Sequence, residues 1–199
     1  MQRLTCIVEG RGDVLAFPNL CARIIQYLGV ADAWIVDTYP IRNPRSRLVN
    51  EGDPSPHRQC NQDGIARALT LAATRNPAAV LIACDSDDDC PATWGPHATS
   101  EIVGRGMSGV AVMPVREYES WLLWNFPKQK RDQFRIFAPE TIRDAKGALA
   151  KLFPNYLPTA HQLKLTREID IANVRRDSKS FDKLVRGLAQ LFNVVPPPR

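Results

Sequence analysis

Short apolar runs alternate with stretches of helical periodicity along the first part of the chain. Four apolar runs predict strands, because runs of this length bounded by polar or turn residues are typical of strands buried on both faces. They lie at residues 4–8, 33–36, 79–84 and 110–113. Apolar positions at helical spacing predict helices at 13–28 and 62–75 and a short helix near 100–103. This alternation predicts an α/β fold with a Rossmann-like, four-stranded, mainly parallel sheet flanked by helices.

The pattern changes after residue 127. Apolar spacing predicts three further helices at 139–152, 159–174 and 180–192. Residues 1–127 carry 11 Lys and Arg against 14 Asp and Glu, whereas residues 128–199 carry 15 against 7. We therefore expect an α/β domain over 1–127 and a basic helical extension over 128–199 packed on it. An acidic half followed by a basic half fits a polyanionic partner held against a cation site, and it also fits an ordinary basic surface.

Cysteine use and hydropathy predict a cytoplasmic protein with no membrane segment. The five cysteines form no C-x-x-C pair, and the first ten residues have the apolar run of a strand and not the longer one of a secretion signal. Reduced thiols are therefore expected. No apolar run approaches the ~18 residues that a membrane helix requires.

The third apolar run ends in an acidic cluster. Residues 79–84 lead directly to Asp85, Asp87, Asp88 and Asp89. In open α/β sheets ligands bind at the carboxyl ends of strands, so these side chains are expected at a binding edge. Four carboxylates over five residues repel one another unless a cation neutralises them or water solvates them. A divalent metal site and a solvated acidic turn both remain open on this pattern.

Further carboxylates follow the first and last runs. Glu9 leaves the first strand and Asp13 begins the following helix, so both would join the acidic cluster if the first and third strands are neighbours. Glu9 could equally be a surface acid, and Asp13 an N-cap. Glu117 and Glu119 follow the fourth strand, and only one of them is expected to reach the site because residues two apart on a helix do not share a face. Trp121 and Trp124 are expected in the core.

Basic residues near these acids are candidates for phosphate contact. The proline-rich segment 37–60 is too interrupted for a helix or a central strand, and long loops of this kind are often functional. Guanidinium and ammonium groups suit a phosphate backbone, although each could simply be solvated. The candidates for binding nucleic acid are Arg11, Arg42, Arg45, Arg47, Arg58 and Lys146.

Two sets of motifs resemble known families. The strand ending in "VEGRGD", Val8 to Asp13, and the later "DSD", Asp85 to Asp87, resemble the TOPRIM domain of topoisomerases, bacterial primases and overcoming-lysogenization-defect nucleases over residues 4–114. The stretches "REYESWLL", "HQLKLTREIDI" and "DSKSFDKLVRGL" resemble the domain-of-unknown-function 4276 family, a TOPRIM-like family often seen beside ATPases in bacterial anti-phage gene neighbourhoods. The second resemblance spans nearly the whole chain.

The TOPRIM resemblance implies roles for individual acids. Glu9, Asp85 and Asp87 would be catalytic, with Glu9 as a metal ligand or general acid/base and the two aspartates holding Mg²⁺ or Mn²⁺. Asp13 would join a second metal, and Glu119 or Glu117 would be a further carboxylate ligand. Such a site fits a Mg²⁺-dependent endonuclease or nickase acting on DNA in preference to RNA, as the effector of a defence system with an ATPase partner. Asp88 and Asp89 exceed the motif and are expected in solvent or outside the metal's direct contacts.

Other functions stay open at this stage. A topoisomerase or primase is disfavoured, because no strand-passing or zinc-binding module is evident. A non-catalytic subunit could bind a partner ATPase or nucleic acid through the "WLLW" helix, residues 121–124, or through the C-terminal helices. Phosphotransfer to an aspartate is a weaker alternative. A zinc site is weaker still, because its candidates match no common ligand spacing: His57, Cys60, Cys84 and Cys90.

Overall fold

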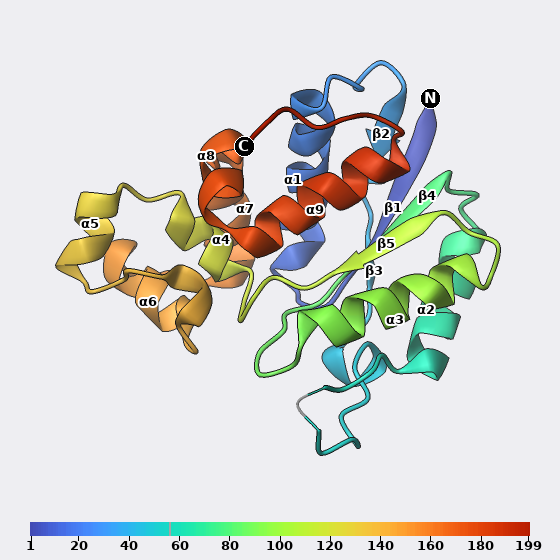
Figure 1. Cartoon of the computed structure of the whole chain (residues 1–199), viewed down its shortest axis with the longest axis horizontal. Helices are drawn as coiled ribbons and strands as arrows, with labels where there is room; N and C mark the ends of the chain where they lie inside the picture. The colour runs from blue at the N-terminus through green and yellow to red at the C-terminus, as the bar shows by residue number, and fades with distance from the viewer. Residues whose placement is uncertain (56) are drawn as a thin grey trace.

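The protein has an α/β fold in which a parallel sheet lies between two layers of helices (Figure 1). The computed structural model describes residues 1–55 and 57–199, so Pro56 of the proline-rich segment lies outside the described residues. The strands are β1 (Gln2–Val8), β2 (Trp34–Val36), β3 (Ile41–Arg42), β4 (Ala79–Ala83) and β5 (Gly109–Val112). Their order is β2-β1-β4-β5, with β3 also paired to β1, and every pairing is parallel. The predicted α/β class is confirmed, and the short β3 adds a strand within the predicted loop.

The central strands are buried on both faces, as their unbroken apolar runs predict. In β1, Leu4, Cys6 and Val8 contribute to one hydrophobic cluster and Ile7 contributes to the other. Strand β4 divides its residues between the same two clusters in the same alternating way. Because successive side chains of a strand point to opposite faces, one short run of apolar residues supplies two cores.

Nine α-helices complete the part of the chain that the structure describes. They are α1 (Asp13–Tyr27), α2 (Gln62–Ala73), α3 (Pro91–Val103), α4 (Glu119–Trp124), α5 (Lys128–Gln133), α6 (Ala145–Leu152), α7 (Pro158–Arg167), α8 (Ile171–Asp177) and α9 (Lys179–Leu191). Two 3₁₀ turns, η1 (Arg45–Arg47) and η2 (Pro139–Thr141), lie between them. Helices α2 and α3 cover one face of the sheet, and α1, α4 and α6–α9 bury their apolar residues in the cluster on the other face.

Three helix predictions need correction. The helix expected near residues 100–103 extends back to Pro91, which occupies a first-turn position where a proline costs no hydrogen bond. The helix expected over 159–174 is divided into α7 and α8, because the Asp170 side chain accepts a hydrogen bond from the Asn173 N–H and starts a new helix. The helix expected over 139–152 begins as η2, and α6 starts only after Asp144 caps it.

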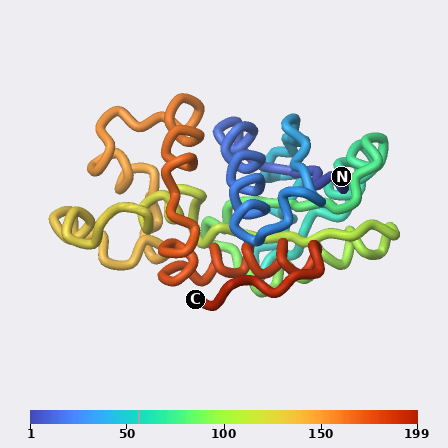
Figure 2. Tube along the Cα trace, turned by 90° about the horizontal axis from the view of Figure 1, so that it is seen from above, coloured from blue at the N-terminus to red at the C-terminus, as the bar shows by residue number. Residues whose placement is uncertain are grey.

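The C-terminal helices share a core with the first helix. An aromatic stack joins Phe17 of α1, Tyr118, Trp121 of α4 and Phe181 of α9, with successive ring centroids 5.1, 5.4 and 5.3 Å apart. Figure 2 shows residues 158–191, orange to red, alongside α1 in blue. Trp121 is therefore a core residue, as predicted. The division into domains at residue 127 stays a prediction.

No helix among the described residues has both the length and the apolar character needed to cross a membrane.

Candidate carboxylate site at the sheet edge

The register of the two central strands brings Glu9 and Asp85 together. Val8 pairs with Ala83, so the chain leaves both strands at the same level of the sheet edge. There Glu9 Oε2 accepts hydrogen bonds from the Asp85 N–H (3.1 Å) and from Cys84 Sγ (3.0 Å). Burial raises the pKa of Glu9, while the contact with Cys84 and the charge of Arg45 oppose that rise. The neighbouring strands thus place the first two predicted site residues next to one another.

Asp13 enters the same site from the start of α1. Its Oδ2 accepts a hydrogen bond from the Gly10 N–H (2.8 Å), and its Oδ1 accepts one from Gln162 Nε2 of α7 (2.8 Å). The close approach of α7 depends on Gly12, because a Cβ there would lie 1.9 Å from Gln162 Oε1. Asp13 is buried, and this burial raises its pKa.

Asp85 is the electrostatic centre of the group. Its Oδ1 accepts a hydrogen bond from the Tyr118 N–H (2.9 Å), and its Oδ2 lies 3.9 Å from Lys146 Nζ. Burial raises the pKa of Asp85 well above its ordinary value, and the charges of Asp13, Glu119 and Glu9 raise it further. This mutual repulsion means that four carboxylates lie within electrostatic reach of one another.

Glu119 supplies the fourth carboxylate from the first turn of α4. Its Oε1 accepts a hydrogen bond from the Tyr156 hydroxyl (2.9 Å), whereas its Oε2 is buried and has no hydrogen-bond partner among the described residues. Burial raises the pKa of Glu119 to about 7. A buried carboxylate oxygen without a partner is costly, so this atom is free to accept a cation or a proton.

The four carboxylates line one cavity of about 250 Å³. Arg11, Lys146, Thr159 and Gln162 are also among its lining residues. Lys146 Nζ forms an ion pair with Glu117 Oε1 (2.7 Å). Although burial opposes its charge, the pKa of Lys146 is raised by Glu119, Glu117 and Asp85. A fixed ammonium therefore lies at the wall of an otherwise acidic cavity.

The cavity offers oxygen donors that suit a divalent cation. Among the described residues, no three His, Cys, Asp and Glu side chains are already arranged to enclose a metal ion. The cavity's acids nevertheless offer hard oxygen donors, one of them the orphaned Glu119 Oε2. Oxygen donors suit Mg²⁺, which keeps several of its waters and needs few protein ligands. The residues therefore fit Mg²⁺ in donor chemistry, and binding would require them to draw closer.

Asp87 lies outside the carboxylate cavity. It adopts a left-handed backbone conformation (φ +48°), its side chain is half exposed, and it does not line the cavity. Its Oδ2 lies 3.3 Å from Arg45 Nε. The structure thus brings together Glu9, Asp13, Asp85 and Glu119 and leaves Asp87 outside the group.

The next two aspartates have different surroundings from each other. Asp88 is exposed and pairs with Arg116 and Arg143. Asp89 is buried and pairs with Arg45, while Arg58 Nη1 lies 3.5 Å away, so of the two expected placements it is not in solvent. The ion pair of Asp89 with Arg45 therefore ties residues 85–89 to the 37–60 segment.

The candidate phosphate-binding residues fall into three groups. Arg45 and Arg58 both approach Asp89, so their charges are already opposed within the protein. Arg45 also donates to the carbonyl oxygens of Asp85 and Ser86. Arg42 and Arg47 are exposed at and beside β3. Arg11 and Lys146 line the acidic cavity. Only the last two groups have side chains placed to meet a phosphate from solvent.

The four histidine and cysteine candidates for zinc do not converge on one site, although the His57 side chain hydrogen-bonds Cys90. Cys84 Sγ contacts Glu9, and Cys60 Sγ lies 2.9 Å from His97 Nδ1. No zinc-like group of these side chains occurs in residues 1–55 and 57–199.

Several residues that hold the carboxylates in place carry no signal in the sequence. Gln162 orients Asp13, Tyr156 holds Glu119, and the Tyr118 N–H binds Asp85. Gln162 lies within the "HQLKLTREIDI" stretch, so that motif marked its segment without indicating its role. Tyr156 lies between helices in an irregular segment and carries no pattern that distinguishes it.

Fold and site together define an α/β protein with a carboxylate cavity at the carboxyl edge of a parallel sheet. The sequence model of the family described as "Domain of unknown function (DUF4276)" matches residues 8–189. The chain belongs to this family. No curated protein and no solved structure matches it.

Proposed function

We propose that this protein is a TOPRIM-type, metal-dependent nucleic-acid phosphodiester hydrolase that uses Mg²⁺ or Mn²⁺. The observation that carries the proposal is the convergence of four buried or mostly buried carboxylates, from three separate segments of the chain, on one cavity. Perturbed carboxylates gathered in a cleft are typical of functional sites, since stability alone does not favour such repulsion.

The residues of the cavity have separable roles in this proposal. Glu9, Asp13, Asp85 and Glu119 would hold the cation. A bound cation would polarise the scissile phosphate and lower the pKa of a water molecule. Lys146 Nζ offsets phosphate charge at the cavity wall. Before a cation binds, Glu119, with its pKa raised to about 7, can hold or release a proton at Oε2 near neutral pH.

The substrate would lie across the mouth of the cavity. Arg11 is exposed at its lining, and Arg42 and Arg47 are exposed on the segment that follows β2. These cations support a polyanionic substrate, with DNA proposed in preference to RNA. Asp87 remains a candidate only for the rim, because it pairs with Arg45 outside the cavity.

A cleavage assay tests the proposal. Purified protein is incubated with supercoiled plasmid, single-stranded DNA and RNA in Mg²⁺, in Mn²⁺ and in EDTA. We expect metal-dependent nicking or cleavage that Asp85→Asn and Glu119→Gln each reduce by at least about 100-fold, the usual scale for removing a metal or acid/base group. Asp88→Asn is the matched control, since this aspartate is exposed outside the cavity, and it should cleave as the wild type does. Absence of cleavage of all substrates, or equal activity of Asp85→Asn, would refute the proposal.

We further propose that the protein works in the cytoplasm as the effector of a bacterial defence system with an ATPase partner. Support comes from the family resemblance alone. The "WLLW" segment is a poor interface, because Trp121, Leu122 and Leu123 are buried. Gel filtration of the protein with the ATPase encoded beside it tests this association. Co-elution that persists in Asp85→Asn, together with absence of cleavage in the assay above, would favour the non-catalytic alternative.

A further inference from the structure

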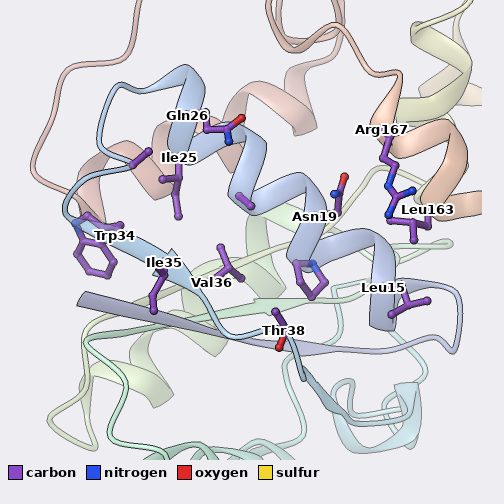
Figure 3. Close-up of a pocket in the computed structure, with 13 residues that line it drawn as sticks. Leu15, Asn19, Ile25, Gln26, Trp34, Ile35, Val36, Thr38, Leu163 and Arg167 are labelled. Carbon is purple, nitrogen blue, oxygen red and sulfur yellow. The ribbon is translucent and has the colours of Figure 1, made fainter. Parts of the chain in front are cut away.

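A second, larger groove runs along the first helix from Leu15 to Gln26. It has a volume of about 500 Å³ and runs between α1, β2 and the end of α7 (Figure 3). Its walls are mostly apolar, with Leu15, Ile25, Trp34, Ile35, Val36 and Leu163 among the lining residues. Leu15 is 56% exposed and Ile35 is 38% exposed. We call this feature the edge groove.

The floor of the edge groove is the terminal strand of the sheet. Strand β2 pairs only with β1 among the described residues. The Asp37 N–H donates to the Leu4 carbonyl, and the Gln2 N–H donates to the Ala33 carbonyl. The backbone N–H and C=O groups of the odd-numbered residues from 33 to 37 therefore face β1. By the alternation of a strand, the backbone groups of Val36 then face outward. An outward-facing backbone beside a groove is a template for another strand.

The α7 end of the edge groove is polar. Arg167 is exposed, and its guanidinium has no hydrogen bond or ion pair within residues 1–55 and 57–199. Asn19 also lines the groove, and its buried Oδ1 lacks a hydrogen-bond partner among the described residues. Figure 3 shows Arg167 beside Leu163 at this end, with Trp34 at the other. The groove thus combines apolar walls with an exposed cation at one end.

We propose that the edge groove binds an extended peptide segment of a partner protein, which adds to β2 as a strand. Apolar side chains of the peptide pack between α1 and β2, and an acidic residue pairs with Arg167. Backbone hydrogen bonds supply affinity in this mode, and pockets for alternate side chains supply specificity. A groove open along a strand edge favours a peptide over a compact small molecule, and the charge of Arg167 favours an acidic partner over a second copy of this chain, which carries a net charge of +5.

The probe is a set of fluorescein-labelled hexapeptide pools with Val, Ile, Leu or Phe at alternate positions and either Glu or Lys at the last position. Binding is measured by fluorescence anisotropy in EDTA, so it does not depend on the proposed nuclease activity. We expect a Glu pool to bind more tightly than its Lys counterpart. Arg167→Ala should weaken Glu-pool binding on the order of tenfold, the usual effect of losing one charge-assisted hydrogen bond. Arg105→Ala, at another exposed arginine, should leave it unchanged.

Two further variants test the groove itself. Ile35→Lys places a charge in the apolar floor, and Ala22→Trp fills the groove from α1; both should abolish peptide binding. Leu71→Lys is the matched control, because Leu71 is also an exposed apolar residue and lies on α2. Hydrogen exchange followed by mass spectrometry should show protection of β2 in the complex.

Four results would overturn the proposal. They are absence of binding by every pool, equal binding of Glu and Lys pools, binding without protection of β2, and self-association of the free protein that Ile35→Lys removes. Binding of the amphipathic anion 1-anilinonaphthalene-8-sulfonate without peptide binding would instead assign the groove to a small molecule. None of these results affects the cleavage assay.

Discussion

Glu9 Oε2 accepts a hydrogen bond of 3.1 Å from the backbone N–H of Asp85, a residue 76 positions further along the chain. The bond exists because β1 and β4 are parallel neighbours that end at the same level. It fixes the first carboxylate against the second and places both beside Asp13 and Glu119. The predictions below follow from the repulsion and the ion pairs that this convergence creates.

Neutralising Asp85 should stabilise the metal-free protein. Burial and the nearby acids raise its pKa, so keeping it ionised at pH 8 costs free energy in the folded state. We expect Asp85→Asn to raise the free energy of unfolding at pH 8 by on the order of 1 kcal/mol, the usual size of a stabilising substitution. Urea denaturation in EDTA measures this change. A variant less stable than the wild type at pH 8 would contradict the prediction.

The free energy of unfolding should depend on pH through Glu119. Its pKa is about 7 in the folded protein against 4.5 for an unperturbed glutamate, so the folded state binds the proton more tightly. Stability from this group is therefore greatest below pH 4.5 and falls as the pH rises to about 7. Over that interval the wild type should lose up to about 3 kcal/mol relative to Glu119→Gln.

The measurement is urea denaturation of both proteins from pH 4.5 to 8 in EDTA, repeated in Mg²⁺. Because a cation favours the ionised carboxylate, Mg²⁺ should reduce the loss in the wild type and leave Glu119→Gln nearly unchanged. If the free energies of unfolding of the two proteins change in parallel with pH, Glu119 is not the source of the pH dependence.

Removing the Asp89 carboxylate should destabilise the folded protein. Asp89 is buried against Arg45, and truncating it removes the buried carboxylate partner of this guanidinium, which keeps only the half-exposed Asp87 and more distant acids. We expect Asp89→Ala to lower the free energy of unfolding by about 3 kcal/mol. Asp88→Ala is the comparison, because its exposed ion pairs should contribute less than about 1 kcal/mol. Equal effects of the two substitutions would show that burial of Asp89 does not matter.

Substitution of Gly12 should displace α7 and the Gln162 side chain that binds Asp13. A Cβ there would lie 1.9 Å from Gln162 Oε1 and 2.9 Å from Pro158 Cβ, so α7 would have to move. We expect Gly12→Ala to lower the free energy of unfolding by about 1–3 kcal/mol and to weaken the hydrogen bond that orients Asp13. Thermal unfolding measures the first effect. Gly52→Ala, where a Cβ would meet nothing nearer than 3.6 Å, should be close to neutral.

Local sequence was sufficient for the strands and for the position of the first acids. An apolar run that ends in a carboxylate predicts a buried strand and a charged strand end without any knowledge of the partners. The position of Glu9 beside Asp85 followed once the strands were assumed to be neighbours. The edge groove gave no such signal, because Leu15 and Ile35 are ordinary apolar positions in their elements, and only the packing leaves them uncovered.

Sequence alone could not distinguish the surroundings of the aspartates in the acidic cluster. Asp85, Asp87 and Asp89 are alike in sequence, yet one faces the cavity, one is half exposed and one is buried against Arg45. These different surroundings result from the left-handed backbone at Asp87 and from Arg45 of the 37–60 segment, which pairs with Asp87.

The amino-acid sequence thus determined the strands, most helices and the level at which Glu9 and Asp85 leave the sheet, because hydrophobic periodicity acts locally. Tertiary structure alone decided which acids share the cavity, that Arg45 binds inside the protein, and that Gln162 of α7 reaches Asp13. The physical reason is that ion pairs and hydrogen bonds between distant side chains depend on where packing brings the elements together, and no spacing along the chain encodes that distance.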